Sequence, residues 1–254
     1  MNEEWRVLNS GFHNAFTNMA IDEAILREVS EGKVPPTVRF YSWKPRAISL
    51  GYFQSLHEEV DLEQCQRHGV DVVRRITGGG AVFHDQELTY SIVVSESHRE
   101  IPKNIMKSYQ RICGAVIKGL RHLDIKGVYA PINDILVDGR KISGNAQTRK
   151  QGTVLQHGTI LMDVDVDTMF SLLKVPNEKL KDKLITDVKQ RVTSLQHILG
   201  KPIPYEQVAS AMKDGFEEEF DVSLVEGTLT ENELILAHEI ERKRFSQPAW
   251  NQKK

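Results

Sequence analysis

The chain has 254 residues and a hydrophobic fraction of 40%, enough to bury a sizeable core in a single domain spanning residues 1–254. Lys and Arg number 33 against 35 Asp and Glu, giving a net charge of -2, and no dense basic run favours nucleic acid as a partner. The acidic start MNEEWRVLNSG and the lack of about eighteen consecutive apolar residues argue against export and membrane spanning, so we expect a cytoplasmic protein.

The two cysteines, Cys65 and Cys113, are far apart and form no CxxC pair. Reduced thiols in a cytosolic compartment are the expected state, and we predict neither a disulfide nor a metal site.

The first half of the chain mixes helices and strands. Apolar residues at helical spacing predict a helix over 19–29, which the glycine and prolines at 32–36 end. Two β-branched and aromatic runs, 38–43 and 47–53, are separated by three residues and predict paired strands. A short helix is expected over 58–68, strands over 70–75, 81–83 and 88–95, and a long helix over 105–120.

The second half begins with a strong hairpin signal. Asp138 and Gly139 separate two alternating runs, and the segment 153–164 continues the sheet. Beyond about Asp167 the pattern becomes helical, and we expect a short helical tail from about residue 178. Thr230 and Glu233 form a capping box at the start of a helix running towards Arg244.

The segment RRITGGGAVFHD, residues 74–85, combines arginines with three consecutive glycines between two strands. Glycines there suit unusual dihedral angles or the close approach of a ligand to bare main-chain amides. Beside them, Arg75 can hold a carboxylate or a phosphate. A flexible turn with surface arginines explains the composition equally well.

A second segment, NDILVDGRKISGNA (133–146), presents Lys141 two residues after the hairpin turn. A compact positive charge at this position can polarise an acyl carbonyl and stabilise an oxyanion. The alternatives are a solvated strand lysine and, for Asp134, a hairpin cap. His84 and His157 can order a substrate or accept a proton, although each is also compatible with a structural histidine.

Taken together, RRITGGGAVFHD, NDILVDGRKISGNAQ and QHGTILMDVD resemble the three ordered motifs of the lipoate-protein ligase A family, and YFQ at 52–54 resembles its early strand-end motif. The resemblance covers roughly residues 5–185. It implies an α+β fold, with a mixed and largely antiparallel sheet flanked by helices, related to biotin ligases and class II aminoacyl-tRNA synthetases.

The family's ligase reaction uses ATP, with Mg²⁺ arriving on the nucleotide, to convert lipoate or octanoate to an acyl-AMP. A carrier lysine then attacks and AMP leaves. By resemblance, Lys141 is the catalytic residue and contacts the carbonyl and phosphate region. The remaining residues expected to bind acyl-adenylate are Arg75, Gly80, Ala81, Val82, Phe83, His84, Asp134, Ala146 and His157.

Two departures from the ligase pattern affect the predicted function. The chain has no room for the accessory domain of about a hundred residues found in many bacterial ligases, so activation of lipoate can require a separate small subunit. HDQELTYS resembles the related octanoyltransferases more than the ligases. Those transferases carry the acyl group on a cysteine shortly before the stretch that corresponds to NDILVDGRKISG, and residues 126–132 contain none.

The leading prediction is ATP-dependent lipoylation of carriers such as the glycine-cleavage H protein or the E2 subunits of 2-oxoacid dehydrogenases. The alternative is octanoyl transfer from acyl carrier protein without ATP. A third hypothesis is a non-catalytic protein that binds lipoyl groups or carriers.

Overall fold

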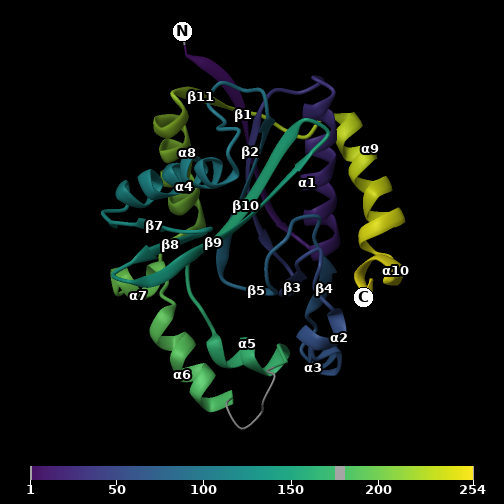
Figure 1. Ribbon diagram of the computed structural model, residues 1–254, viewed down its shortest axis with the longest axis vertical. Coiled ribbons are helices and arrows are strands. Elements are labelled where there is room, and N and C mark those ends of the chain that lie inside the picture. The colour runs from purple at the N-terminus through teal and green to yellow at the C-terminus, as the bar shows by residue number, and fades with distance from the viewer. Residues whose placement is uncertain (1, 175–180, 254) are drawn as a thin grey trace.

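The computed structural model describes residues 2–174 and 181–253 of the chain. Its main element is an eight-stranded sheet with the order β11-β1-β2-β6-β10-β9-β8-β7 (Figure 1). The two pairings that involve β1 are parallel and the others are antiparallel. The strands are β1 (Glu3–His13), β2 (Thr37–Trp43), β6 (Glu87–Ser95), β7 (Val128–Ala130), β8 (Asp134–Val137), β9 (Arg140–Lys150), β10 (Thr153–Leu161) and β11 (Val222–Glu226). The predicted mixed, largely antiparallel sheet is confirmed.

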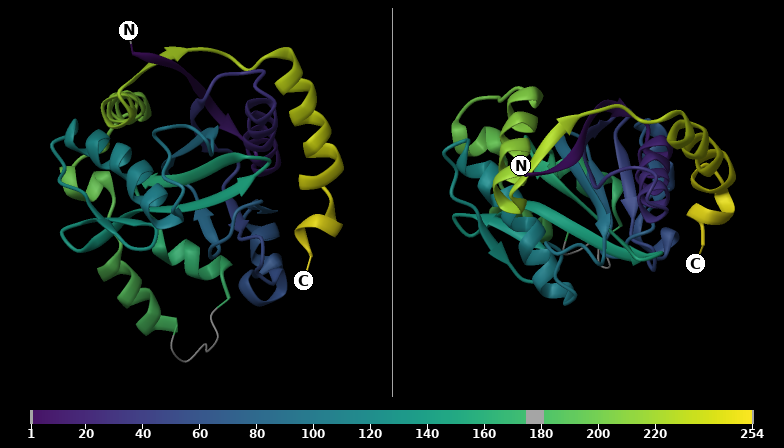
Figure 2. Two further views of the ribbon diagram at one scale, coloured as in Figure 1. Left: turned by 45° about the horizontal axis from the view of Figure 1, so that its top comes forward. Right: turned by 90° about the horizontal axis from the view of Figure 1, so that it is seen from above.

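Helices cover both faces of this sheet (Figure 2). One face carries α4 (Ile105–Arg121) and α8 (Tyr205–Phe220), and the other carries α1 (Ala15–Ser30), with α9 (Glu231–Ile240) packed on its outer side. The shorter helices are α2 (Leu56–Glu59), α3 (Leu62–Arg67), α5 (Val166–Leu172), α6 (Lys181–Arg191), α7 (Leu195–Leu199), the π-helical turn η2 (Glu241–Phe245) and α10 (Pro248–Asn251). No helix in the described part of the chain combines the length and apolarity needed to cross a bilayer.

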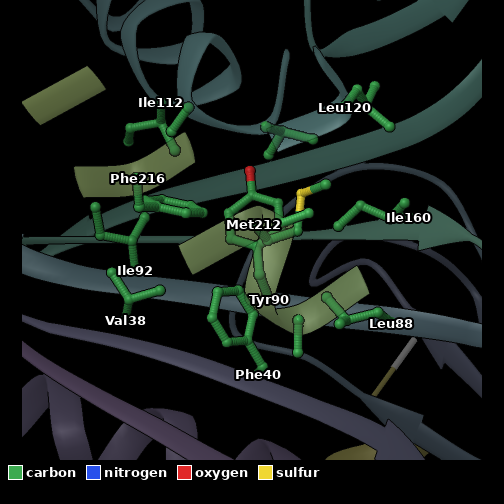
Figure 3. Packing of buried hydrophobic residues seen from close by; sticks show 14 of the residues in the cluster. Val38, Phe40, Leu88, Tyr90, Ile92, Ile112, Leu120, Ile160, Met212 and Phe216 are labelled. Atoms are coloured by element: carbon green, nitrogen blue, oxygen red, sulfur yellow. The ribbon is translucent and has the colours of Figure 1, made fainter. Parts of the chain in front are cut away.

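The strand β6 shows how alternation divides the structure into a core and a site. Leu88, Tyr90 and Ile92 point into the apolar layer beneath α4 and α8, where they meet residues such as Ile112, Met212 and Phe216 (Figure 3). Because successive side chains of a strand point to opposite faces, Thr89 and Ser91 face α1 instead. Both are buried, so these polar side chains of β6 lie in the interior on the α1 side of the sheet.

A second, three-stranded sheet has the order β4-β3-β5 and comprises β3 (Ala47–Leu50), β4 (Asp71–Arg74) and β5 (Val82–His84). The prediction that the runs 38–43 and 47–53 pair with each other is wrong. The strand β2 pairs with β1 and β6 in the large sheet, whereas β3 pairs with β4 and β5. The strands that these runs form, β2 and β3, are buried on both faces, so their apolar composition predicts strands but not partners.

The structure confirms the β8–β9 hairpin, in which Asp138 and Gly139 adopt φ angles of 49° and 75°. The capping box of Thr230 and Glu233 is also present. Three strands were not predicted from the sequence: the N-terminal β1, the short β7, and the late β11, which pairs with β1. The stretch expected to be a helical tail therefore contributes a strand to the large sheet, and Phe216 and Phe220 of α8 belong to its core. The proposed start of the tail, residue 178, lies outside the described residues.

Candidate functional site

A cavity of about 160 Å³ lies on the α1 side of the large sheet, where the small sheet and the glycine-rich loop approach it. Its lining comes from segments far apart in sequence: the helix α1, the strands β2, β6, β9 and β10 of the large sheet, β3 and β5 of the small sheet, the loop after β4 and the residue before β8. The lining residues are Met19, Tyr41, Trp43, Ser49, Arg75, Gly79, Gly80, Ala81, Val82, His84, Thr89, Asn133, Lys141, Gly144, Asn145, Ala146, His157, Gly158 and Thr159.

The cavity has a buried end and an open end. Tyr41 and Trp43 lie on β2 and are at most 4% exposed, whereas the side chain of Lys141, on β9, is 41% exposed. Since the sheet order is β2-β6-β10-β9, these ends are three strand spacings apart, roughly 14 Å. A ligand in the cavity would run across the strands from the solvent-facing lysine to the buried aromatic end.

Lys141 is held by its surroundings at the open end. Its Nζ lies 2.7 Å from Oδ1 of Asp134 on the neighbouring strand β8. Its carbonyl accepts a hydrogen bond from the backbone N–H of Thr193. Gly144 leaves room for this side chain, because a Cβ there would lie 2.9 Å from the Lys141 Nζ and would displace the ammonium. Asp134 does not line the cavity itself but fixes the ammonium that does.

Arg75 is buried below the glycine loop and donates five hydrogen bonds. They go to the carbonyls of Ser49, Gly78 and Gly80 and to the hydroxyls of Ser49 and Thr77, at 2.7 to 3.1 Å. A guanidinium has five N–H donors, so none is spare for a substrate carboxylate or phosphate. Burial lowers the pKa of Arg75 to about 10. Arg75 therefore holds the glycine loop in its conformation, and its buried guanidinium forms part of the cavity wall.

The glycine loop needs its glycines for close packing as well as for dihedral freedom. Gly79 has a φ of 96°, in the region that favours glycine. A Cβ on Gly51, at the end of β3, would lie 1.9 Å from the Gly79 carbonyl oxygen. The turn after β3 and the glycine loop are therefore in backbone contact, and neither can move far without the other.

His157 lines the cavity as predicted, and the structure shows how it is oriented. Its Nε2 lies 2.7 Å from Oγ1 of Thr77 and its Nδ1 lies 3.3 Å from Oδ2 of Asp22, a buried carboxylate of α1. Burial lowers the pKa of His157, although Asp22 opposes that effect. The imidazole is therefore neutral at pH 7. Its Nδ1 then donates to Asp22 and its Nε2 accepts from Thr77.

His84 also lines the cavity and belongs to a second network. Its Nε2 lies 2.7 Å from Oγ of Ser49, its Nδ1 lies 2.6 Å from Oε1 of Glu87, and its ring stacks on Trp43 with 4.0 Å between centroids. This order of hydroxyl, imidazole and carboxylate has the form of a hydrolase triad. It lies at the buried end of the cavity, beside Trp43 and distant from Lys141.

Most of the predicted binding residues converge on this one cavity: Arg75, Gly80, Ala81, Val82, His84, Lys141, Ala146 and His157. The prediction that Phe83 lines it is wrong for the side chain. On β5 the side chains alternate, so Val82 and His84 face the cavity while Phe83 packs against the apolar cluster that includes Ile48 and Leu172.

Sequence reasoning missed the residues that close the buried end, among them Met19, Tyr41, Trp43, Ser49 and Thr89. They lie on a helix and strands whose apolar periodicity is typical of any core. A local signal existed only for Asn145 and Gly144, which belong to the segment KISGNA around Lys141.

Neither cysteine lines the cavity. Cys113 lies on α4 and faces the core, where burial raises its pKa to about 12, while burial raises the pKa of Cys65 to about 11. A thiolate nucleophile is therefore absent from the part of the site that the structure describes. No cluster of three or more His, Cys, Asp or Glu residues suited to a metal ion occurs within residues 2–174 and 181–253.

Comparison with known proteins gives one family. Residues 14–217 match the family described as the lipoyl protein ligase A/B catalytic domain. Among curated proteins, the chain is 40% identical to an octanoyltransferase LipM of Geobacillus kaustophilus and 34% identical to that of Bacillus subtilis. Each alignment covers 99% of this chain and 99% of the relative.

Solved structures agree with this match. The bipartite lipoate protein ligase of Thermoplasma acidophilum superposes with a TM-score of 0.90 at 33% identity, covering 98% of this chain and 96% of the other. A lipoate-protein ligase A bound with ATP superposes with a TM-score of 0.85 at 31% identity, covering 98% of both chains.

Proposed function

Since the chain belongs to the lipoyl protein ligase A/B catalytic-domain family, we propose that it attaches an octanoyl or lipoyl group to a lysine of a lipoyl carrier domain. The observation that carries this proposal is the form of the cavity. A single ammonium, Lys141, stands at the solvent-facing end, and the opposite end is closed by buried aromatic side chains. A medium-chain acyl group has the matching form, with one polar reactive end and one apolar tail.

The proposed orientation places the acyl carbonyl beside Lys141 and the tail towards Tyr41 and Trp43. The amine of a carrier protein has to reach the carbonyl from solvent, and Lys141 marks the exposed end. The same reasoning excludes Ser49 as an acyl acceptor despite its bond to His84, because Ser49 is 2% exposed at the tail end. His84 and Glu87 would then hold Trp43 and shape the tail pocket.

At the open end, the carrier amine attacks the acyl carbonyl and forms a tetrahedral intermediate with a negative oxygen. The Lys141 ammonium stabilises that oxygen, and Asp134 keeps the ammonium in place beforehand. Collapse of the intermediate breaks the bond to the donor, and the proton released by the amine leaves with the departing group. Most of the rate gain comes from holding the two reactants in contact and from this fixed charge.

We propose octanoyl carried as a thioester on acyl carrier protein as the first candidate donor. The names of the curated relatives support this alternative over the ATP-dependent prediction, since those proteins are octanoyltransferases and match nearly the whole chain. Without a thiol in the described cavity, transfer would proceed directly from the thioester to the carrier amine.

The second candidate donor is an acyl-AMP made from lipoate or octanoate with ATP. Two observations favour it: the missing thiol, since an acyl adenylate needs no enzyme nucleophile, and the similarity to a ligase bound with ATP. Mg²⁺ would arrive with the nucleotide phosphates. In this case a separate accessory subunit becomes plausible, because the Thermoplasma relative is described as bipartite.

The acceptors that we propose are the glycine-cleavage H protein and the E2 subunits of 2-oxoacid dehydrogenases. The same Thermoplasma structure is described together with an E2 lipoyl domain, which supports the second class.

The test is acyl transfer to a purified apo carrier domain, read as intact mass. One reaction contains octanoyl-acyl carrier protein without ATP, and the other contains free lipoate with Mg-ATP. Product in the first reaction alone establishes octanoyl transfer, and product in the second alone establishes the ligase. No product with either donor or carrier, also after addition of a candidate accessory subunit, contradicts the proposed activity and supports the non-catalytic hypothesis.

A further inference from the structure

The C-terminal segment 245–251 contacts the glycine-rich motif through Arg74, the neighbour of the cavity residue Arg75. Arg74 is fully buried, and its guanidinium makes five hydrogen bonds, all to main-chain carbonyls. Two of the carbonyls belong to Trp250 and Asn251, and the other three to the turn after β3, at Gly51, Tyr52 and Gln54. No acidic side chain pairs with Arg74 among the residues that the structure describes. Its guanidinium therefore joins two segments of backbone.

The contact is reciprocal and has specific geometry. The Asn251 side-chain oxygen accepts from the Arg74 backbone N–H at 2.9 Å, and the Trp250 indole N–H donates to the Arg74 carbonyl at 2.8 Å. The Asn251 amide also donates to the carbonyl of Phe245 at 2.6 Å, which fixes the turn of the C-terminal segment itself. The backbone N–H and the carbonyl of Arg74 thus both bond to residues of α10, which lies along the edge of β4.

The turn held by Arg74 is in contact with the cavity wall. Gly51 lies against Gly79, so closely that a Cβ there would overlap the Gly79 carbonyl, and the backbone N–H of Tyr52 donates to the carbonyl of Thr77. Gly79 lines the cavity directly. A displacement of Trp250 and Asn251 would therefore pass through Arg74 and the turn 51–54 to the loop that faces the acyl donor.

The C-terminal segment is also anchored on its other side, against α1. Phe245 is buried in the cluster with α1, Arg244 pairs with Glu23, and Glu241 accepts from the Thr17 hydroxyl at 3.1 Å. These contacts hold α9 and η2 against α1 without touching Arg74. The segment accordingly has two attachments, one to α1 and one to the glycine-rich motif, and they meet where Phe245 and Arg244 contact the Trp250 ring.

From this arrangement we infer that Trp250 and Asn251 are positioning residues for the acyl-donor site, acting through Arg74 on the turn 51–54 and the glycine loop. The inference rests on the proposed function, because it assumes that the donor occupies the cavity. It assigns a role in donor binding to the end of the chain, whose sequence resembles none of the motifs on which the predicted site depends.

The test compares Asn251→Ala and Trp250→Phe with the matched control Glu241→Ala, which weakens the attachment of the same segment to α1. Octanoate is the probe for binding by calorimetry, and steady-state transfer provides KM for the donor and for the carrier. Loss of the Arg74 contacts should raise the octanoate Kd and the donor KM about tenfold while the carrier KM stays constant. The control should lower the melting temperature with no change in octanoate binding.

Asn251→Asp provides a conservative comparison, because it keeps the acceptor for the Arg74 N–H and should recover part of the donor affinity. Wild-type affinity in Asn251→Ala and Trp250→Phe, or equal effects in Glu241→Ala at equal loss of melting temperature, overturns the positioning role and leaves a purely structural one. A wild-type protein that binds no octanoate and transfers no acyl group would instead contradict the proposed function itself.

Discussion

The Nζ of Lys141 and the Oδ1 of Asp134 lie 2.7 Å apart across the β8–β9 hairpin. Among the described residues that line the cavity, Lys141 is the only lysine, and it lies at the open end. The Lys141 side chain is 41% exposed and that of Asp134 is 32% exposed, so solvent screens the pair and its contribution to stability is small. Its importance lies in where it holds the ammonium.

Replacement of Lys141 by Ala should reduce kcat by about 10²- to 10³-fold, since the oxyanion loses its fixed positive partner. The free energy of unfolding should change by about 0.5 kcal/mol or less, because 41% of the side-chain surface is exposed. Single-turnover transfer with saturating donor measures the first effect and urea unfolding the second. Unchanged transfer by Lys141→Ala would place the oxyanion elsewhere, and loss of transfer with donor binding preserved excludes the non-catalytic hypothesis.

Asp134→Asn should give a smaller loss of kcat than Lys141→Ala, because the ammonium remains but loses its anchor. The two changes should also be less than additive, since Asp134 acts through Lys141. A double-mutant cycle on the transfer rate checks this coupling. Fully additive effects would show that Asp134 contributes by a separate route.

The double change Cys65→Ala with Cys113→Ala should leave the transfer rate at the wild-type value. Both thiols are buried outside the cavity, and burial raises their pKa to about 11 and about 12, so neither supplies a thiolate at pH 7. The assay is transfer from octanoyl-acyl carrier protein, combined with a search for a hydroxylamine-sensitive acyl-enzyme by mass. Disappearance of activity in the Cys113→Ala single variant would restore the cysteine route.

Arg75→Lys should destabilise the protein by about 3 kcal/mol even though the charge is conserved. A lysine has three donors and no planar fork, so carbonyls of Ser49, Gly78 and Gly80 would remain buried without all their partners. The midpoint of urea unfolding at constant m measures the loss. Arg46→Lys is the matched control, since Arg46 is 47% exposed and pairs with Asp85 at the surface. Equal midpoints for the two variants would contradict the prediction.

His157 should make the protein less stable as the pH falls below about 6.5. Burial lowers the pKa of His157 in the folded state, so below its ordinary value the unfolded chain binds the proton more readily than the folded one. The free energy of unfolding then decreases with falling pH, by at most about 1.4 kcal/mol per pH unit for one group. The fall continues until the pH reaches the lowered pKa of the folded state.

Urea unfolding between pH 7.5 and 5.5 checks this slope against that of His157→Gln. Asp22, whose pKa is lowered from an ordinary value near 4, titrates below this window and leaves the comparison clear. In Asp22, burial works against the change, but the hydrogen bond from His157 and the charge of Arg39 together outweigh it. An identical slope in wild type and variant would mean that His157 titrates equally in both states.

Local sequence chemistry determined the hairpin at Asp138 and Gly139 and the long helix α4. Turn residues, capping residues and side-chain period act within a few positions, so they are readable without knowing the fold. The segments around Arg75, Lys141 and His157 were recognisable through their resemblance to the ordered motifs of the lipoate-protein ligase A family.

What the tertiary structure alone decided was which segments meet. The runs 38–43 and 47–53 are equally apolar, and only long-range pairing assigns them to different sheets. The pairing of β1 with β11 brings Glu3 opposite Val222, and Phe83 turns away from the cavity that its neighbours line. Likewise, only the structure shows that all five N–H donors of Arg75 are hydrogen-bonded within the protein and that Arg74 holds the C-terminal segment. The burial of a side chain and the strand with which a strand pairs depend on residues far away in the sequence, and local periodicity contains no information about them.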